Sequence, residues 1–120
     1  MAEYIPILKP GRAVTLKASA TVAAGQVVAI TGDNTVGPAG SASTAVVGVA
    51  GQDAATNDSI VVYAGGVQNV LASGAVTAGS PVIAGAAGTV AASATPPAGQ
   101  QVGIALTGGT GVLIRVQFSR

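Results

Sequence analysis

Carboxylates are the first side chains to consider as chemical groups, because the chain contains no histidine and no cysteine. Asp53 and Asp58 lie close together, in the segment from Gln52 to Ser59. Two neighbouring carboxylates can act as a general acid and a general base. The same spacing in a polar segment is typical of a solvated loop, and we favour that interpretation.

Two further segments carry fragments of known binding motifs. Gly108-Gly109-Thr110-Gly111 suggests a phosphate cradle, but the lysine that a P-loop needs after its glycines is missing, so we expect a hairpin turn. Asp33-Asn34 matches one fragment of a calcium loop without its other oxygen ligands, and we expect a type I′ or related turn. Serine and threonine have no histidine base to activate them. The sequence therefore predicts no catalytic residue, no cofactor, no metal and no enzymatic activity.

The composition excludes other classes of protein. Hydrophobic residues make up 49% of the 120 residues and charged residues 8%, which is the opposite of a disordered chain. The net charge of +1 and the three aromatic side chains give no basis for binding DNA or stacking single-stranded bases. We therefore expect no nucleic-acid partner and no small-molecule substrate.

A membrane partner is not expected either. Gly, Pro, Ser and Thr interrupt every apolar stretch before it reaches the roughly 20 residues of a transmembrane helix. The segment from Met1 to Pro6 has no basic region followed by an apolar run, so we expect no signal peptide and synthesis in the cytoplasm.

The elements that must position these groups are predicted to be short strands. Valine outnumbers leucine by 18 to 5, and β-branched residues favour extended structure. Glycine-rich or proline-rich turns separate the candidate strands, which indicates an all-β barrel or sandwich. The candidate strands cover residues 13–18, 26–30, 45–50, 59–63, 67–72, 81–84, 89–91, 101–106 and 112–118.

An internal repeat of about 54 residues relates the two halves of the chain. It places Gly25 on Gly79, Thr35-Val36 on Thr89-Val90 and, with one extra residue, Gly48 on Gly103. Glycine inside a strand indicates a bulge, a bend or a close backbone approach. We therefore predict one compact β domain over residues 13–120, made of pseudo-repeats at about 13–66 and 67–120.

Residues 1–12 are predicted to form an extended N-terminal arm, because Pro6 and Pro10 disfavour helix. The arm holds the densest cluster of bulky apolar side chains in the chain. It could cover the domain's own barrel, or it could bind a partner by strand addition or by filling a groove. The candidate contact residues are Tyr4, Ile5, Pro6, Ile7, Leu8, Lys9, Pro10 and Arg12.

Several segments in order resemble the small capsid decoration (cement) proteins of tailed bacteriophages, a family once labelled as phage recombinases. They are Tyr4-Ile5-Pro6, Lys9-Pro10-Gly11-Arg12, Gly25-Gln26-Val27-Val28, Thr31-Gly32-Asp33, Val46-Val47-Gly48-Val49-Ala50, Val62-Tyr63-Ala64-Gly65-Gly66 and Val102-Gly103-Ile104-Ala105-Leu106. The likeness covers nearly the whole chain. The recombinase label finds no support, because the nucleotide-binding loop is absent.

The resemblance implies a compact β-protein bound to the outside of an assembled phage head. It further implies a homotrimer that bridges neighbouring capsomers and contacts the major capsid protein, often through the N-terminal arm. The alternatives are another virion β-module, such as a head-fibre base or a receptor-contacting protein, and a small binding or enzymatic barrel.

Overall fold

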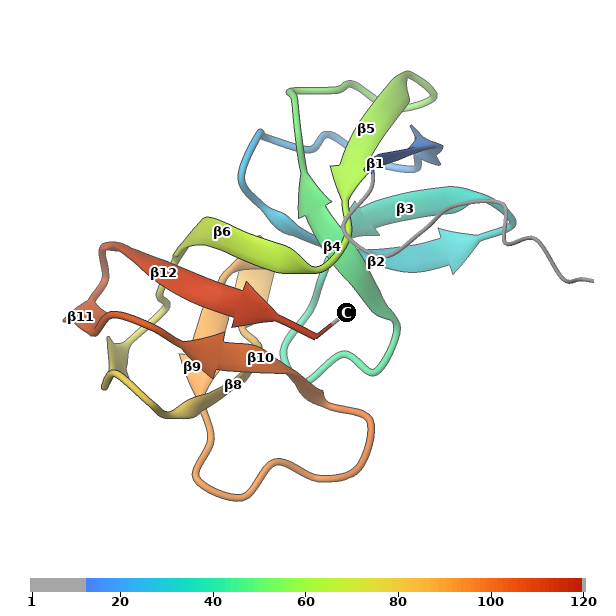
Figure 1. The fold of residues 1–120 in the computed structure, drawn as a ribbon. Coiled ribbons are helices and arrows are strands. Elements are labelled where there is room, and N and C mark those ends of the chain that lie inside the picture. The colour runs from blue at the N-terminus through green and yellow to red at the C-terminus, as the bar shows by residue number, and fades with distance from the viewer. Residues whose placement is uncertain (1–12, 120) are drawn as a thin grey trace, which may run out of the picture.

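A computed structural model describes residues 13–119, which form twelve short strands and one turn of 3₁₀ helix. The predicted all-β class is confirmed. Figure 1 shows two adjoining halves, the strands β1 to β5 in one and the strands β6 to β12 in the other. The predicted N-terminal arm lies outside the described residues, so the division of the chain into an arm and one domain stays a prediction.

The first half is a closed barrel in the order β1-β3-β2-β4-β5. β1 pairs antiparallel with β5 from Ala13 to Lys17 and parallel with β3 at its end, and this second pairing closes the sheet. Closure leaves the barrel without a free pair of edges. The five strands are β1 (Ala13–Ala18), β2 (Val27–Gly32), β3 (Thr35–Pro38), β4 (Val46–Ala50) and β5 (Ser59–Tyr63).

The second half is a five-stranded sheet in the order β6-β12-β10-β8-β9, with a separate two-stranded ladder of β11 and β7. A turn of 3₁₀ helix, η1 (Ala86–Gly88), connects β8 to β9. The strands are β6 (Gly66–Leu71), β7 (Ala75–Val76), β8 (Pro81–Ala84), β9 (Val90–Ala92), β10 (Gln101–Ala105), β11 (Gly109–Thr110) and β12 (Leu113–Phe118).

The observed strands match the predicted ones within two residues at each end, with three additions. β3 begins at the Thr35-Val36 pair of the repeat and is paired antiparallel with β2. β7 and β11 are two residues long, too short to leave a pattern in the sequence. The sequence predicts that Gly109-Thr110 is part of a hairpin turn. The segment does reverse the chain between β10 and β12, but its residues also pair with Val76 and Ala75.

The internal repeat is visible in the strand register. Leu16 lies opposite Ile60 in the first half, and Val70 lies opposite Ile114 in the second, each pair 54 residues from the other. The parallel closure of the barrel at Ala18 and Val36 has its counterpart in a parallel bridge between Ala72 and Val90.

Side-chain hydrogen bonds repeat at the same offset. The hydroxyl of Ser19 donates to the carbonyl of Val36 at 3.2 Å, and that of Ser73 donates to the carbonyl of Val90 at 3.3 Å. The two halves therefore share one backbone plan.

Gly48 and Gly103 lie at equivalent bends, as the sequence predicts. Beside each of them the strand register shifts, which marks a bulge. A Cβ atom at Gly48 would overlap the carbonyl oxygen of Tyr63, and one at Gly103 would overlap that of Gln117. Only glycine lets the neighbouring strand approach this closely.

The two halves are joined through their cores. One cluster of buried side chains, which includes Ile60, Val62 and Val36, belongs to the barrel alone. The other combines Ile114 and Val116 of the second half with Val27 and Val49 of the barrel. β2 and β4 thus supply apolar side chains to both cores, so the second half packs on the barrel instead of standing apart.

Candidate functional site

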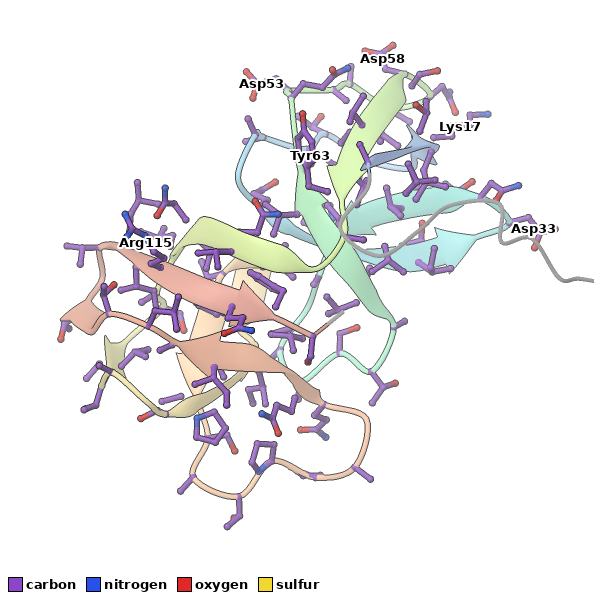
Figure 2. All side chains as sticks on the ribbon, in the orientation of Figure 1. Lys17, Asp33, Asp53, Asp58, Tyr63 and Arg115 are labelled. Carbon is purple, nitrogen blue, oxygen red and sulfur yellow. The ribbon has the colours of Figure 1, made fainter. Side chains whose placement is uncertain are left out.

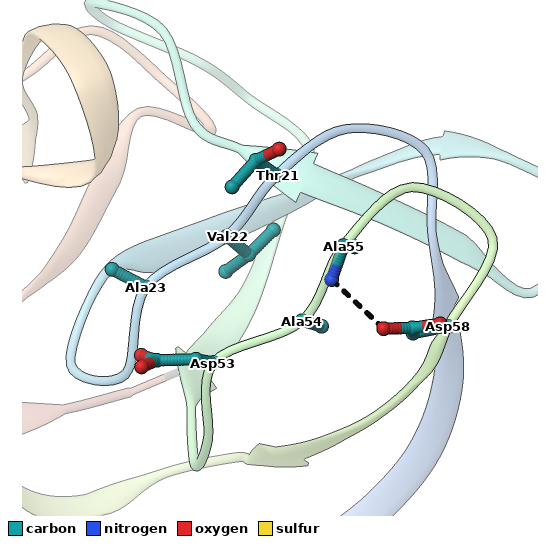
Figure 3. Close-up of a pocket in the computed structure, with 7 residues that line it drawn as sticks. All are labelled: Thr21, Val22, Ala23, Asp53, Ala54, Ala55 and Asp58. Atoms are coloured by element: carbon teal, nitrogen blue, oxygen red, sulfur yellow. Dashed lines mark hydrogen bonds between the residues drawn. The ribbon is translucent and has the colours of Figure 1, made fainter.

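A shallow hollow on the barrel half brings the two predicted carboxylates together with small apolar side chains (Figure 3). Val22 and Ala54 pair through two backbone hydrogen bonds of 2.9 Å and are almost completely buried. We call this feature the acidic hollow. It is lined by Thr21, Val22, Ala23, Asp53, Ala54, Ala55 and Asp58.

The two carboxylates of the acidic hollow hold the backbone of its loops. Asp53 Oδ1 accepts a hydrogen bond from the N–H of Ala24 at 2.8 Å. Asp58 Oδ2 accepts one from the N–H of Ala55 at 3.0 Å, which Figure 3 shows as a dashed line. The second oxygen of each carboxylate has no partner within residues 13–119. Each aspartate is therefore oriented by one oxygen and free to meet a cationic group with the other.

The other motif fragments have structural roles. Thr35 Oγ1 donates to the carbonyl of Asp33 at 2.8 Å across the two-residue connection between β2 and β3. Asn34 has a φ of 50°, whereas Asp33 does not have a positive φ, so the connection is a tight turn but not the expected type I′, which needs a positive φ at both residues. The glycine-rich segment forms β11, and a Cβ at Gly108 would come within 2.8 Å of the carbonyl oxygen of Val76. The backbone of this segment pairs with β7 and therefore does not form a loop around an anion.

Within residues 13–119 no cluster of three or more acidic, histidine or cysteine side chains is able to hold a metal ion. In the same part of the chain no helix has the length and apolar character to cross a membrane. The candidate contact residues of the arm, from Tyr4 to Arg12, lie outside the described residues.

The feature that sequence reasoning missed is an apolar outer surface on the second half. It lies on the strands β6, β12 and β10, around Arg115. In Figure 2 Arg115 lies apart from the labelled aspartates of the barrel. We call this surface the Arg115 face. Its side chains are Val67, Asn69, Leu71, Ile104, Leu106, Leu113, Arg115 and Gln117, all of them exposed.

The signal for this surface lies in the sequence as apolar residues at adjacent positions of a strand. Leu113 precedes the buried Ile114, and Leu71 follows the buried Val70. Because side chains alternate between the two faces of a strand, one member of each pair must point outward. A chain in which 49% of residues are hydrophobic makes such pairs easy to overlook.

Comparisons with known proteins give a matching family and a solved structure with a similar fold. The model of a family described as phage cement protein matches residues 8–116. Among solved structures, the head fibre gp8.5 N base of bacteriophage phi29 is similar, with a TM-score of 0.69 and 21% sequence identity over 90% of this chain and 93% of that chain. No curated protein sequence matches the chain significantly. At this identity the likeness to the head fibre base concerns the fold alone.

Proposed function

The chain belongs to the phage cement protein family, whose members are structural proteins of the phage capsid, and on that premise we propose that it decorates the outer surface of the assembled head. In this role it binds the major capsid protein and stabilises the shell by bridging neighbouring capsomers as a homotrimer. The observation that carries the proposal is the family match, which extends over residues 8–116 and so includes nearly all of the described fold.

The described structure suits a binding role. Its carboxylates support loops, its glycine-rich segment is a strand, and its surface carries an apolar face. A decoration protein needs a rigid fold and repeated contacts, since modest contacts in each copy add up when several copies are linked. We propose on the same grounds that it catalyses no reaction.

The N-terminal arm is proposed as the contact with the capsid. Its bulky side chains Tyr4, Ile5, Ile7 and Leu8 supply the apolar anchors that dominate most protein interfaces. Lys9 and Arg12 add positive charge that an acidic capsid surface would attract.

Removal of residues 1–12 tests this contact. We expect the shortened protein to lose binding to heads that lack the decoration protein, measured by co-sedimentation, while its melting curve remains cooperative. A full-length variant with Lys9→Ala alone serves as the control and should lose only part of the affinity, because a single exposed charge contributes little. Undiminished binding of a folded, shortened protein would contradict the role of the arm.

The likeness to the head fibre gp8.5 N base favours a second candidate, the base of a head fibre. In that case the protein carries a further fibrous part or partner at the head surface. The two candidates predict different effects of the purified protein on heads. A decoration protein binds heads without any partner and makes them more resistant to heat or chelators. A fibre base leaves that resistance unchanged.

A further inference from the structure

The Arg115 face combines exposed apolar side chains with one charge. Leu113 lies directly opposite Leu71, Arg115 opposite Asn69, and Gln117 between Val67 and Ile104, so these residues project from the same side of the sheet. The exposed fractions are 68% for Leu113, 54% for Val67 and 44% for both Leu71 and Ile104. Clusters of exposed large aliphatic side chains mark interaction sites more often than scattered ones do.

The internal repeat shows that folding does not require this surface. The cross-strand pair Leu71–Leu113 corresponds to the pair Lys17–Ser59 of the barrel, at the same register on the same backbone plan. Val67 likewise corresponds to Ala13. At these three positions the barrel folds with small or polar side chains where the second half has large apolar ones, although at the position of Gln117 the barrel carries the exposed Tyr63. Folding therefore does not account for the large side chains of Val67, Leu71 and Leu113.

Charge is divided between the halves in a complementary way. Arg115 is the single charged side chain between residues 67 and 119. Within residues 13–119 its guanidinium has no hydrogen-bond or ion-pair partner. The segment 13–66 holds one lysine against three aspartates, a net charge of −2. Two of these aspartates, Asp53 and Asp58, border the acidic hollow, which lies apart from Arg115 in Figure 2.

The acidic hollow has the features that a neighbouring arginine requires. Both carboxylates are oriented by backbone N–H groups, and each keeps one oxygen without a partner in the described part of the chain. A guanidinium has a planar array of donors that suits carboxylates, and its alkyl stem packs well on apolar surface. The exposed side chains of Ala23 and Ala55 provide a small apolar surface of this kind in the hollow, whereas Val22 and Ala54 are almost completely buried.

We propose that the Arg115 face of one copy docks on the acidic hollow of a second copy of this chain, with Arg115 between Asp53 and Asp58. The two surfaces differ, so the contact is head-to-tail, and a head-to-tail contact generates a closed ring when the rotation between copies closes. The inference rests on the proposed function, because it specifies the contact that forms the homotrimer. Leu71 and Leu113 exclude water around the ion pair, which strengthens a contact that is weak when solvated.

The test compares the dissociation constant of the assembly of the full-length protein, from sedimentation over a range of concentrations, with that of variants. Arg115→Gln removes the cation. Asp53→Asn with Asp58→Asn removes the anions and keeps the side-chain oxygens that accept the backbone N–H groups. Leu71→Lys with Leu113→Ser installs the residues that the barrel carries at the equivalent positions. Each of the three should raise the dissociation constant about 30-fold or more, the effect of losing one partner of a buried charge pair or an apolar anchor.

Combining Arg115→Gln with the two asparagine substitutions tests for direct contact. If the groups meet across the interface, the combined variant should assemble about as well as the weaker of the two parents, because the second change removes a partner already lost. Asp33→Asn, on the connection between β2 and β3, is the matched control and should leave the assembly unchanged. A cooperative melting curve for every variant shows that it is folded.

Three results would overturn the inference. They are a wild-type protein that is monomeric at all concentrations, a dissociation constant that Arg115→Gln leaves unchanged, and additive changes of the free energy of assembly in the combined variant. Binding of the wild-type protein to undecorated heads, measured in parallel, separates the two proposals. If the protein binds heads and the variants leave its assembly intact, the proposed contact is wrong and the decoration role stands. An assembly that the variants disrupt, but that never binds heads, contradicts the decoration role and supports the contact.

Discussion

At the scale of single residues, Gly48 and Gly103 show why this chain is rich in glycine. Each lies in a strand where the neighbouring backbone comes closer than a side chain allows. They are equivalent in the two halves, so the same close approach is built twice. The high glycine content of the chain therefore reflects its packing, in which small residues let short strands bend and approach one another.

Replacement of Gly103 by alanine tests this explanation. The added methyl group would overlap the backbone of Gln117 and Phe118, neither of which can move aside as a flexible side chain does. We expect Gly103→Ala to destabilise the protein by about 2 kcal/mol or more, measured by chemical denaturation.

Gly74 provides the control for this substitution. A Cβ there meets no atom within 4 Å, and its backbone does not have a positive φ. Gly74→Ala should change the free energy of unfolding by no more than about 0.5 kcal/mol. Equal effects of the two substitutions would rule out close approach as the reason for glycine at position 103.

At the scale of elements, the turn η1 between β8 and β9 combines a tight connection with a strained residue. Ala87 has φ 54° and ψ 43°, the left-handed region in which a side chain is unfavourable. The carbonyl of Ala87 accepts a hydrogen bond from the side chain of Gln26 at 3.1 Å, which links the turn to the barrel. This link across the two halves gives a reason for the turn to keep its geometry.

Ala87→Gly should therefore stabilise the protein. Relief of the left-handed strain outweighs the extra freedom that glycine gives the unfolded chain, for a net gain of about 0.5–1 kcal/mol, or roughly 2–4 °C in melting temperature. Ala86→Gly, one residue earlier and without a positive φ, should instead lower the melting temperature slightly. A decrease with Ala87→Gly as large as that with Ala86→Gly would contradict the assignment of strain.

The elements also show what the sequence could reveal. Valine-rich runs between glycine and proline turns indicated most strands, because each run spans a whole strand and its boundaries are turn residues. β7 and β11 could not be predicted from the sequence, because the pairing of Val76 with Gly109 depends on contacts between distant segments. The exposure of Leu71 and Leu113 could not be predicted either, because hydrophobicity alone does not distinguish the inner face of a strand from the outer one.

At the scale of the whole molecule, the two halves form one body with two different surfaces. The barrel supplies Val27 and Val49 to the core of the second half, so the halves share apolar side chains. Their outer surfaces have diverged, acidic on the barrel and apolar around Arg115 on the second sheet. One backbone plan used twice with different surfaces provides a unit with unlike faces, which suits the proposed assembly into a ring on a larger particle.

The position of the protein on the phage head is the sharpest test of whether it decorates the capsid. Undecorated heads incubated with the purified full-length protein are imaged by electron cryomicroscopy, and the added density is compared with that of untreated heads. For a decoration protein we expect density repeated at equivalent positions over the whole outer shell, each copy matching the two-halved fold of residues 13–119. Density confined to a single vertex or the tail, or none at all, would contradict it.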